Sequence, residues 1–108
     1  MANANNFSTA SEMAMLASHC MKNTVFRNVV KAQKFICKPL NDPNHVYEWQ
    51  NTNFLLDDPQ FNGCKTGVTE VAGPCLASSY CGDDPDSCEY IIILLAARSM
   101  EDRWQDTR

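Results

Sequence analysis

Three strand-like segments in the second half of this 108-residue chain constrain its fold more than any other feature. They cover about Gly63–Val68, Gly73–Tyr80 and Glu89–Ala96, and polar stretches rich in Gly, Pro and Asp separate them. Apolar segments joined by short turn sequences are typical of antiparallel hairpins. The third segment contains the continuous apolar run Ile91–Ala97, which is typical of a strand covered on both faces. We therefore predict an antiparallel sheet in which this third segment is the central strand.

Helix signals lie on both sides of these segments. Thr9–Glu12 has the capping-box pattern, a hydroxyl residue followed three residues later by Glu, and apolar residues then recur at helical spacing. Asn23 and Ser99 are further residues of the kind that begins a helix. With their caps, the predicted helices cover roughly residues 9–21, 23–30 and 99–107.

The middle of the chain predicts a hairpin. Lys31–Cys37 and Val46–Trp49 read as strands, and the turn-rich stretch Leu40–Asn44 lies between them. Asn51–Leu56 then opens a helical turn. The order of helices, hairpin, three strands and helix implies an α+β fold, with an antiparallel sheet flanked by helices.

Composition and charge exclude several classes of protein. The apolar fraction of 44% argues against a disordered chain, and the net charge of −4 gives no support to a nucleic-acid-binding surface. The longest apolar run is too short to span a bilayer. Residues 1–6 have neither a basic nor an apolar region, so we expect no signal peptide in this chain.

The cysteine pattern does not predict a metal site. No CxxC occurs and the two histidines, His19 and His45, are isolated, so we expect neither a metal nor an organic cofactor. Cys81 and Cys88 flank a polar loop and could form a cross-strand disulfide if the segments around them pair as strands. The alternative is that all six cysteines are reduced and most serve as small apolar core residues.

The stretch Asn62–Thr69 carries the most specific chemical signal. It places Lys65-Thr66-Gly67 on a predicted strand. Lys-Thr-Gly is one of three motifs of penicillin-binding proteins and related β-lactamases, where Ser-x-x-Lys supplies the nucleophile and a Ser-x-Asn loop lies between the two. The tripeptide alone is weak, but its position on a strand strengthens it.

Taken together, residues 1–108 resemble the C-terminal part of the catalytic domain in the serine-type D-alanyl-D-alanine carboxypeptidase family, the low-molecular-weight penicillin-binding proteins of peptidase family S11. The similar blocks follow the family's order along nearly the whole chain. They are residues 7–10, 13–17, 25–30, 51–56, 63–69, 72–78, 90–96 and 103–104. The resemblance implies part of the penicillin-binding protein and β-lactamase-like fold.

The resemblance also implies roles for four residues. Lys65 would supply the charge, and Thr66 the hydroxyl donor, that hold the terminal carboxylate of a substrate. Gly67 would let the substrate backbone lie close, and the amide of Val68 would be an oxyanion-hole donor. The expected ligands are peptidoglycan stem peptides ending in D-Ala-D-Ala, and β-lactams. The family acts in the periplasm or outside the cell, and it uses no cofactor.

The departures from the family pattern concern catalysis itself. None of the seven serines is followed by Lys three residues later or by Asn two residues later, so neither Ser-x-x-Lys nor Ser-x-Asn occurs in these 108 residues. Cys64 is not expected to substitute as a nucleophile, because neighbouring strand residues face opposite ways and Lys65 would face the site.

Two hypotheses follow from these departures. The chain is either an inactive piece of a serine carboxypeptidase, completed by the rest of the domain or by another subunit, or a degenerate member of the family. Such a member would bind a peptide carboxylate or serve a structural role in an assembly.

Overall fold

The computed structural model describes residues 3–84, 86 and 88–108, and it confirms the predicted α+β order. The elements are α1 (Ala10–Cys20), α2 (Thr24–Val30), β1 (Lys34–Cys37), β2 (Tyr47–Gln50), the 3-10 helix η1 (Phe54–Asp57), β3 (Phe61–Thr69), β4 (Gly73–Cys81), β5 (Glu89–Leu94) and α3 (Asp102–Gln105). The longest helix, α1, has 11 residues. Among the described residues, no helix combines the length and apolar character needed to cross a membrane.

The predicted helix starts are explained by side-chain caps. Thr9 Oγ1 accepts a hydrogen bond from the Glu12 amide at 3.1 Å, and Asn23 Oδ1 accepts one from the Phe26 amide at 3.0 Å. These bonds satisfy amides that have no partner within the first turn of a helix. The Ser99 hydroxyl similarly accepts from the amide at position 102 at 3.0 Å, although α3 itself begins only there.

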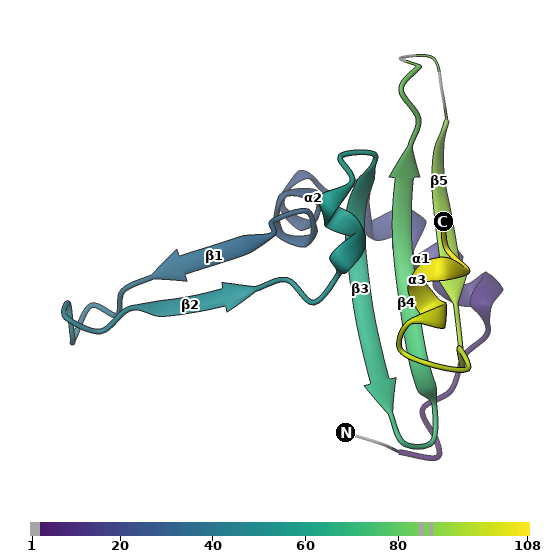
Figure 1. Cartoon of the computed structure of the whole chain (residues 1–108), viewed down its shortest axis with the longest axis horizontal. Coiled ribbons are helices and arrows are strands. Elements are labelled where there is room, and N and C mark those ends of the chain that lie inside the picture. The colour runs from purple at the N-terminus through teal and green to yellow at the C-terminus, as the bar shows by residue number, and fades with distance from the viewer. Residues whose placement is uncertain (1–2, 85, 87) are drawn as a thin grey trace.

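The three predicted strands form one antiparallel sheet in the order β3-β4-β5 (Figure 1). Thr66 stands opposite Leu76, which stands opposite Leu94 on its other side. The prediction that the Glu89–Ala96 segment is the central strand is therefore wrong, because β4 is central and β5 lies at an edge. A continuous apolar run indicates that both faces of a strand are covered, and it carries no information about whether both edges are paired.

Helices and a small core cover the two faces of this sheet. In Figure 1, α3 lies in front of the sheet and α1 lies behind it, against β5. The buried core cluster consists of Leu55, Phe61, Leu76 and Trp104, with Tyr80 and Leu94 packed against it. Because this cluster joins η1, the sheet and α3, it sets where the loop before η1 and the start of α3 lie relative to β3.

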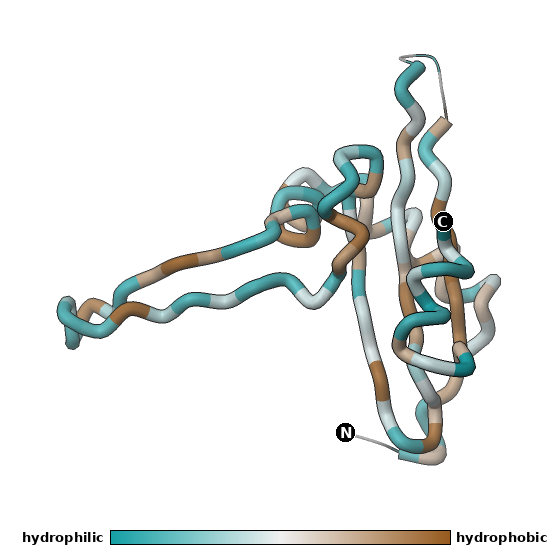
Figure 2. The backbone as a smooth tube through the Cα atoms, in the orientation of Figure 1, coloured by the Kyte–Doolittle hydropathy of each residue, from teal (hydrophilic) through white to brown (hydrophobic). Residues whose placement is uncertain are grey.

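The predicted hairpin is confirmed and projects from the rest of the chain (Figure 1). Strands β1 and β2 form a separate two-stranded antiparallel sheet, with Phe35 opposite Trp49. The two rings lie 6.2 Å apart and Tyr47 stacks on Trp49 at 5.6 Å, while the Lys34–Glu48 ion pair at 3.0 Å links the same strands. Figure 2 shows hydrophobic segments on this hairpin as well as along β5. The pairs between the two strands hold the hairpin together.

The proposed disulfide between Cys81 and Cys88 is not present, and both thiols are free. Glu89, not Cys88, stands opposite Cys81 in the β4–β5 register. Since neighbouring residues on a strand alternate between faces, a cysteine one position from the paired residue is poorly placed for a bond to Cys81. The described residues also contain no group of three or more His, Cys, Asp or Glu side chains that could hold a metal ion.

An ion pair attaches α2 to the last strand. Arg27 Nη1 donates to both carboxylate oxygens of Glu89, at 3.1 and 3.0 Å, and to the Met21 carbonyl oxygen at 3.0 Å. The Ser79 hydroxyl donates to the same carboxylate at 2.5 Å. Partial burial raises the pKa of Glu89, but the Ser79 hydrogen bond and the hydrogen bond and charge of Arg27 outweigh it, so the net pKa is lowered.

This lowered pKa predicts a pH-dependent contribution of Glu89 to stability. A carboxyl whose pKa is lower in the folded state stabilises the fold above its unfolded pKa, and that stabilisation is lost as the pH falls through the folded pKa. We expect Glu89→Gln to lower the unfolding free energy at pH 7 by at most about 1 kcal/mol, because the pair is partly exposed. At pH 3 the substitution should have almost no effect. Urea unfolding at both pH values measures this, with Glu70→Gln in the exposed turn after β3 as control, and an equal loss at both would contradict the assignment.

Candidate functional site

The four residues singled out in the sequence all lie on β3, an edge strand of the sheet. Only β4 pairs with β3, so the other side of the strand faces the loop between β2 and η1. Lys65 is exposed, and its ammonium donates to the Thr66 carbonyl oxygen. An edge strand offers backbone N–H and C=O groups to which an extended ligand can pair.

The register shows which backbone groups face that free edge. Val68 stands opposite Pro74, which has no N–H and whose carbonyl oxygen accepts from the Ala97 amide at 2.9 Å, on the β5 side. A residue's N–H and C=O point to the same side of a strand, so Val68 and Pro74 exchange no backbone hydrogen bonds. The Val68 amide therefore points to the free edge, and so do the backbone groups of Thr66, two residues earlier. This is the direction required for the role that the family resemblance implies for Val68.

A groove of about 360 Å³ runs along this edge. Its lining comes from β3, the loop before η1, and the segment at the start of α3: Gln50, Asn51, Thr52, Phe54, Thr66, Gly67, Val68, Met100 and Arg103. A Cβ built on Gly67 would meet nothing within 4 Å, so the backbone there is open to close approach. Lys65 was expected to face the site, but it is not part of this lining, whereas its neighbours Thr66, Gly67 and Val68 are.

Arg103 is a site residue that sequence reasoning missed. Its side chain lines the groove, is 4% exposed, and lies 4.3 Å above the Trp104 ring. Nη1 donates to the Cys75 carbonyl oxygen at 3.5 Å, whereas Nε has no partner among the described residues. No described carboxylate pairs with this guanidinium. A buried, incompletely paired arginine favours binding of an anion. Residues 103–104 are one of the blocks that resemble the family, but the sequence alone predicted no role for Arg103.

Thr52 is the second site residue that was missed. Its hydroxyl lies 2.5 Å from the Thr66 hydroxyl, and either oxygen could be the donor. This contact links the loop before η1 to the Lys-Thr-Gly strand across 14 residues of sequence. A single threonine in a loop carries no signal of such a contact, because the contact depends on where η1 packs.

Cys64 is not a nucleophile in this arrangement. Burial, then the charges of Glu89 and Cys20, raise the pKa of its thiol to about 11, against the lowering effect of Arg27. The thiol is therefore neutral near pH 7, and the thiolate is the reactive form. That Cys64 does not replace the missing serine stays a prediction, which this raised pKa supports. The groove itself contains the buried cation of Arg103, the hydroxyls of Thr52 and Thr66, and outward-facing backbone groups of β3. Together these groups suit a carboxylate ligand.

Comparisons with known proteins agree with this geometry. The family model described as D-alanyl-D-alanine carboxypeptidase matches residues 1–97. The D-alanyl-D-alanine carboxypeptidase of Streptomyces sp. (strain K15) is 34% identical over 82 residues, which are 73% of this chain but 26% of that protein. The chain therefore spans about a quarter of the length of this curated relative.

Solved structures give the same result at the level of the fold. The crystal structure of the Streptomyces DD-transpeptidase matches 97% of this chain and 40% of its own, with a TM-score of 0.85 and 31% identity. Penicillin-binding protein D2 from Listeria monocytogenes, in its cefotaxime-bound form, matches 99% of this chain and 41% of its own at a TM-score of 0.76. At 22% identity, the second likeness concerns the fold alone.

Proposed function

The chain belongs to the D-alanyl-D-alanine carboxypeptidase family, and on this premise we propose that it forms the carboxylate-binding wall of a serine-type D-Ala-D-Ala carboxypeptidase acting on peptidoglycan stem peptides. One observation carries the proposal. The groove beside Lys65-Thr66-Gly67 brings the Thr66 hydroxyl together with the buried guanidinium of Arg103, which has no described carboxylate partner.

In this proposal, the terminal carboxylate of the peptide accepts hydrogen bonds from Thr66 and Arg103. Lys65, adjacent on the strand, adds positive charge. The open space at Gly67 admits the peptide backbone along the edge of β3. The outward-facing amide of Val68 stabilises the negative charge that develops on the carbonyl oxygen during acyl transfer. β-Lactams would enter the same groove.

The nucleophile must come from elsewhere, because the 108 residues contain neither Ser-x-x-Lys nor Ser-x-Asn. Within the proposal, the serine and its lysine base are supplied by residues outside this sequence, from the rest of the domain or from another subunit. The serine would attack the penultimate carbonyl carbon, release the terminal D-alanine, and leave an acyl-enzyme that water hydrolyses.

A second function is favoured by the same absence. A chain that holds a peptide carboxylate without either catalytic motif would serve as a binding member of the family, or as a structural part of an assembly. Both functions need the groove to bind a peptide carboxylate, but the carboxypeptidase also needs a serine nucleophile and its lysine base.

Two assays test the proposal. Calorimetry should detect binding of an N-acetylated peptide ending in D-Ala-D-Ala, and at least about tenfold weaker binding of its C-terminally amidated analogue, because the amide lacks the charge. Equal affinity for the two peptides would overturn the proposal. A fluorescent penicillin should leave no covalent label on this chain alone, and labelling would refute the assignment of the nucleophile to residues outside it.

The Thr52–Thr66 contact predicts a further effect on binding. The Thr66 hydroxyl has one proton, so if it donates to the carboxylate it must accept from Thr52. We expect Thr52→Val, which removes only the hydroxyl, to weaken binding of the D-Ala-D-Ala peptide about three- to tenfold. Thr52→Ser should keep the wild-type affinity in the same calorimetric titration. If the valine variant binds as tightly as the serine variant, Thr52 does not orient the Thr66 hydroxyl.

A further inference from the structure

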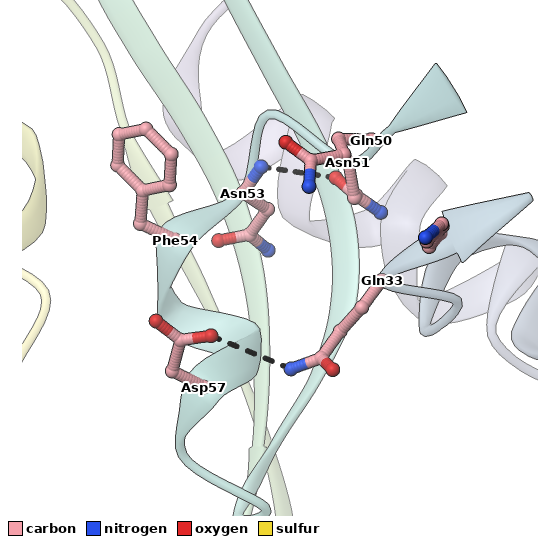
Figure 3. A pocket seen from close by; sticks show the side chains of 7 residues that line it. Gln33, Gln50, Asn51, Asn53, Phe54 and Asp57 are labelled. Carbon is pink, nitrogen blue, oxygen red and sulfur yellow. Dashed lines mark hydrogen bonds between the residues drawn. The ribbon is translucent and has the colours of Figure 1, made fainter. Parts of the chain in front are cut away.

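A second depression, of about 280 Å³, lies beside the groove (Figure 3). Most of its lining is polar and uncharged: Gln33, Lys34, Gln50, Asn51, Asn53, Phe54 and Asp57. We call it the carboxamide pocket, after its four Asn and Gln side chains. It shares Gln50, Asn51 and Phe54 with the groove, so the two depressions are adjacent.

Asn53 contributes an unpaired donor to the carboxamide pocket. The residue is 4% exposed, and its Oδ1 accepts from the Leu55 amide at 3.1 Å, which fixes which end of the side chain is oxygen. The Nδ2 group has no hydrogen-bond partner among the described residues. Figure 3 shows this end of the side chain directed into the space between η1 and Gln33. Buried donors are almost always paired in native proteins, so an unpaired one that borders a pocket points to a ligand acceptor.

Gln33 contributes the complementary acceptor. Its Nε2 donates to the Leu56 carbonyl oxygen at 2.6 Å and lies 3.5 Å from Asp57 Oδ1, so its Oε1 is the end left for a ligand. The Asn51 side chain already has hydrogen-bond partners, because its Nδ2 donates to two backbone carbonyl oxygens and its Oδ1 accepts from the backbone amide of Asn53. The buried Asn53 donor and the Gln33 acceptor therefore remain for a ligand, and the exposed carboxamide of Gln50 also lines the pocket.

The charges around the carboxamide pocket argue against a negatively charged ligand. The Lys34 ammonium is paired with Glu48 at 3.0 Å and the Asp57 carboxylate is within reach of Gln33, so a carboxylate ligand would meet Asp57 and find no free cation. A secondary amide matches what remains, because its C=O can accept from Asn53 and its N–H can donate to Gln33.

We propose that the carboxamide pocket is a subsite for an uncharged secondary amide of a peptide ligand. That this is the peptide whose carboxylate lies in the groove rests on the proposed function. Because the two depressions are adjacent and share Gln50, Asn51 and Phe54, a peptide held by its carboxylate at Thr66 and Arg103 would extend toward Asn53 and Gln33 with a more distant amide. The loop before η1 would then contact the ligand twice, with Thr52 at the groove and Asn53 at the carboxamide pocket.

Two small probes separate this subsite from the groove in ¹H–¹⁵N NMR spectra of the full chain. N-acetylalanine N′-methylamide has two amides and no carboxylate, and acetate has a carboxylate and no amide. We expect the diamide to shift the side-chain NH₂ resonances of Asn53 and Gln33, and acetate to shift the backbone resonances of Thr66 and Gly67. If the diamide leaves the Asn53 and Gln33 resonances unmoved, the subsite is refuted. The acetate experiment reports independently on the groove.

Asn53→Asp isolates the donor. Aspartate keeps an oxygen to accept from the Leu55 amide but replaces the Nδ2 donor by a second acceptor. We expect diamide binding to weaken about tenfold, with the acetate shifts at Thr66 and Gly67 retained. Asn44→Asp, on the exposed turn of the hairpin, makes the same charge change away from the pocket and should bind the diamide as the parent does.

A second variant keeps the proposal testable if Asn53→Asp does not fold. If thermal unfolding shows that Asn53→Asp is not folded, Gln33→Met removes the acceptor on the other side of the pocket and should weaken diamide binding to a similar extent. The proposal would be overturned if Asn53→Asp or Gln33→Met is folded and binds the diamide as tightly as the Asn44→Asp control does.

Discussion

Replacing Arg103 by glutamine is expected to weaken binding of a peptide ending in D-Ala-D-Ala by about ten- to a hundredfold. A hydrogen bond between two charged groups contributes on the order of 1.5–3 kcal/mol, and Arg103 is the buried cation that lines the groove beside Thr66. Glutamine keeps an extended polar side chain but removes the charge and the fork of donors that suits a carboxylate. Isothermal titration with the acid peptide and its C-terminal amide measures the effect, which should be confined to the acid.

Arg98→Gln is the matched control, because Arg98 is exposed and lies outside the groove lining. It changes the net charge equally and should leave the affinity near that of the parent. Lys65→Met extends the comparison, since Lys65 lies beside the groove and acts through its charge, so a smaller loss that added salt diminishes is expected. Equal affinities of the Arg103→Gln and Arg98→Gln variants for the acid peptide would remove Arg103 from the site.

Replacing Leu76 by alanine should have the largest effect on stability. Leu76 is 1% exposed and belongs to the core cluster with Leu55, Phe61 and Trp104. Deleting a buried leucine side chain costs about 2–5 kcal/mol, because apolar contacts are lost and a cavity remains. Total stability is about 5–15 kcal/mol for ordinary domains, so the variant should be markedly unfolded near physiological temperature. Circular dichroism during urea and thermal unfolding measures the loss.

Val71→Ala is the control for this prediction, since Val71 is 92% exposed and its truncation creates no cavity. Its unfolding free energy should stay within about 0.5 kcal/mol of the parent. A loss below about 1 kcal/mol for Leu76→Ala would mean that the cluster of η1, β4 and α3 does not hold the fold together. The same cluster holds Trp104, and through it Arg103, beside β3, so the destabilised variant should also lose peptide binding.

Local features of the fold were predictable because each depends on residues close together in sequence. The cap at Thr9 reaches only to Glu12, and that at Asn23 only to Phe26. The hairpin could be read from two strand-like runs and the turn residues between them. Element ends were less accurate. The first hairpin strand begins at Lys34 and not at Lys31, because Lys31 caps the end of α2.

Relations between distant segments were not predictable in the same way. The isoleucine-rich run predicts a central strand, but packing against α1 and the core cluster covers its faces, and β5 has a paired neighbour on one edge alone. The disulfide hypothesis failed for a similar reason, because the register places Glu89 opposite Cys81. Hydropathy reports how much of a residue is covered and does not report which strand lies beside it.

The three segments that form β3, β4 and β5 separate what the sequence determines from what the tertiary structure decides. By itself, the sequence determined that these segments are strands, that their order implies an α+β fold, and that Lys65-Thr66-Gly67 marks a member of this family, because each of these depends on short stretches of chain. Only the tertiary structure decided that β4 is central, that Thr52 contacts Thr66 at the free edge of β3, and that Arg103 lines the same groove. It also decided that the side-chain Nδ2 group of Asn53 borders a pocket and has no partner among the described residues. The Thr52–Thr66 contact joins residues 14 positions apart, and Arg103 reaches the same groove because a core cluster drawn from η1, the sheet and α3 packs as one unit.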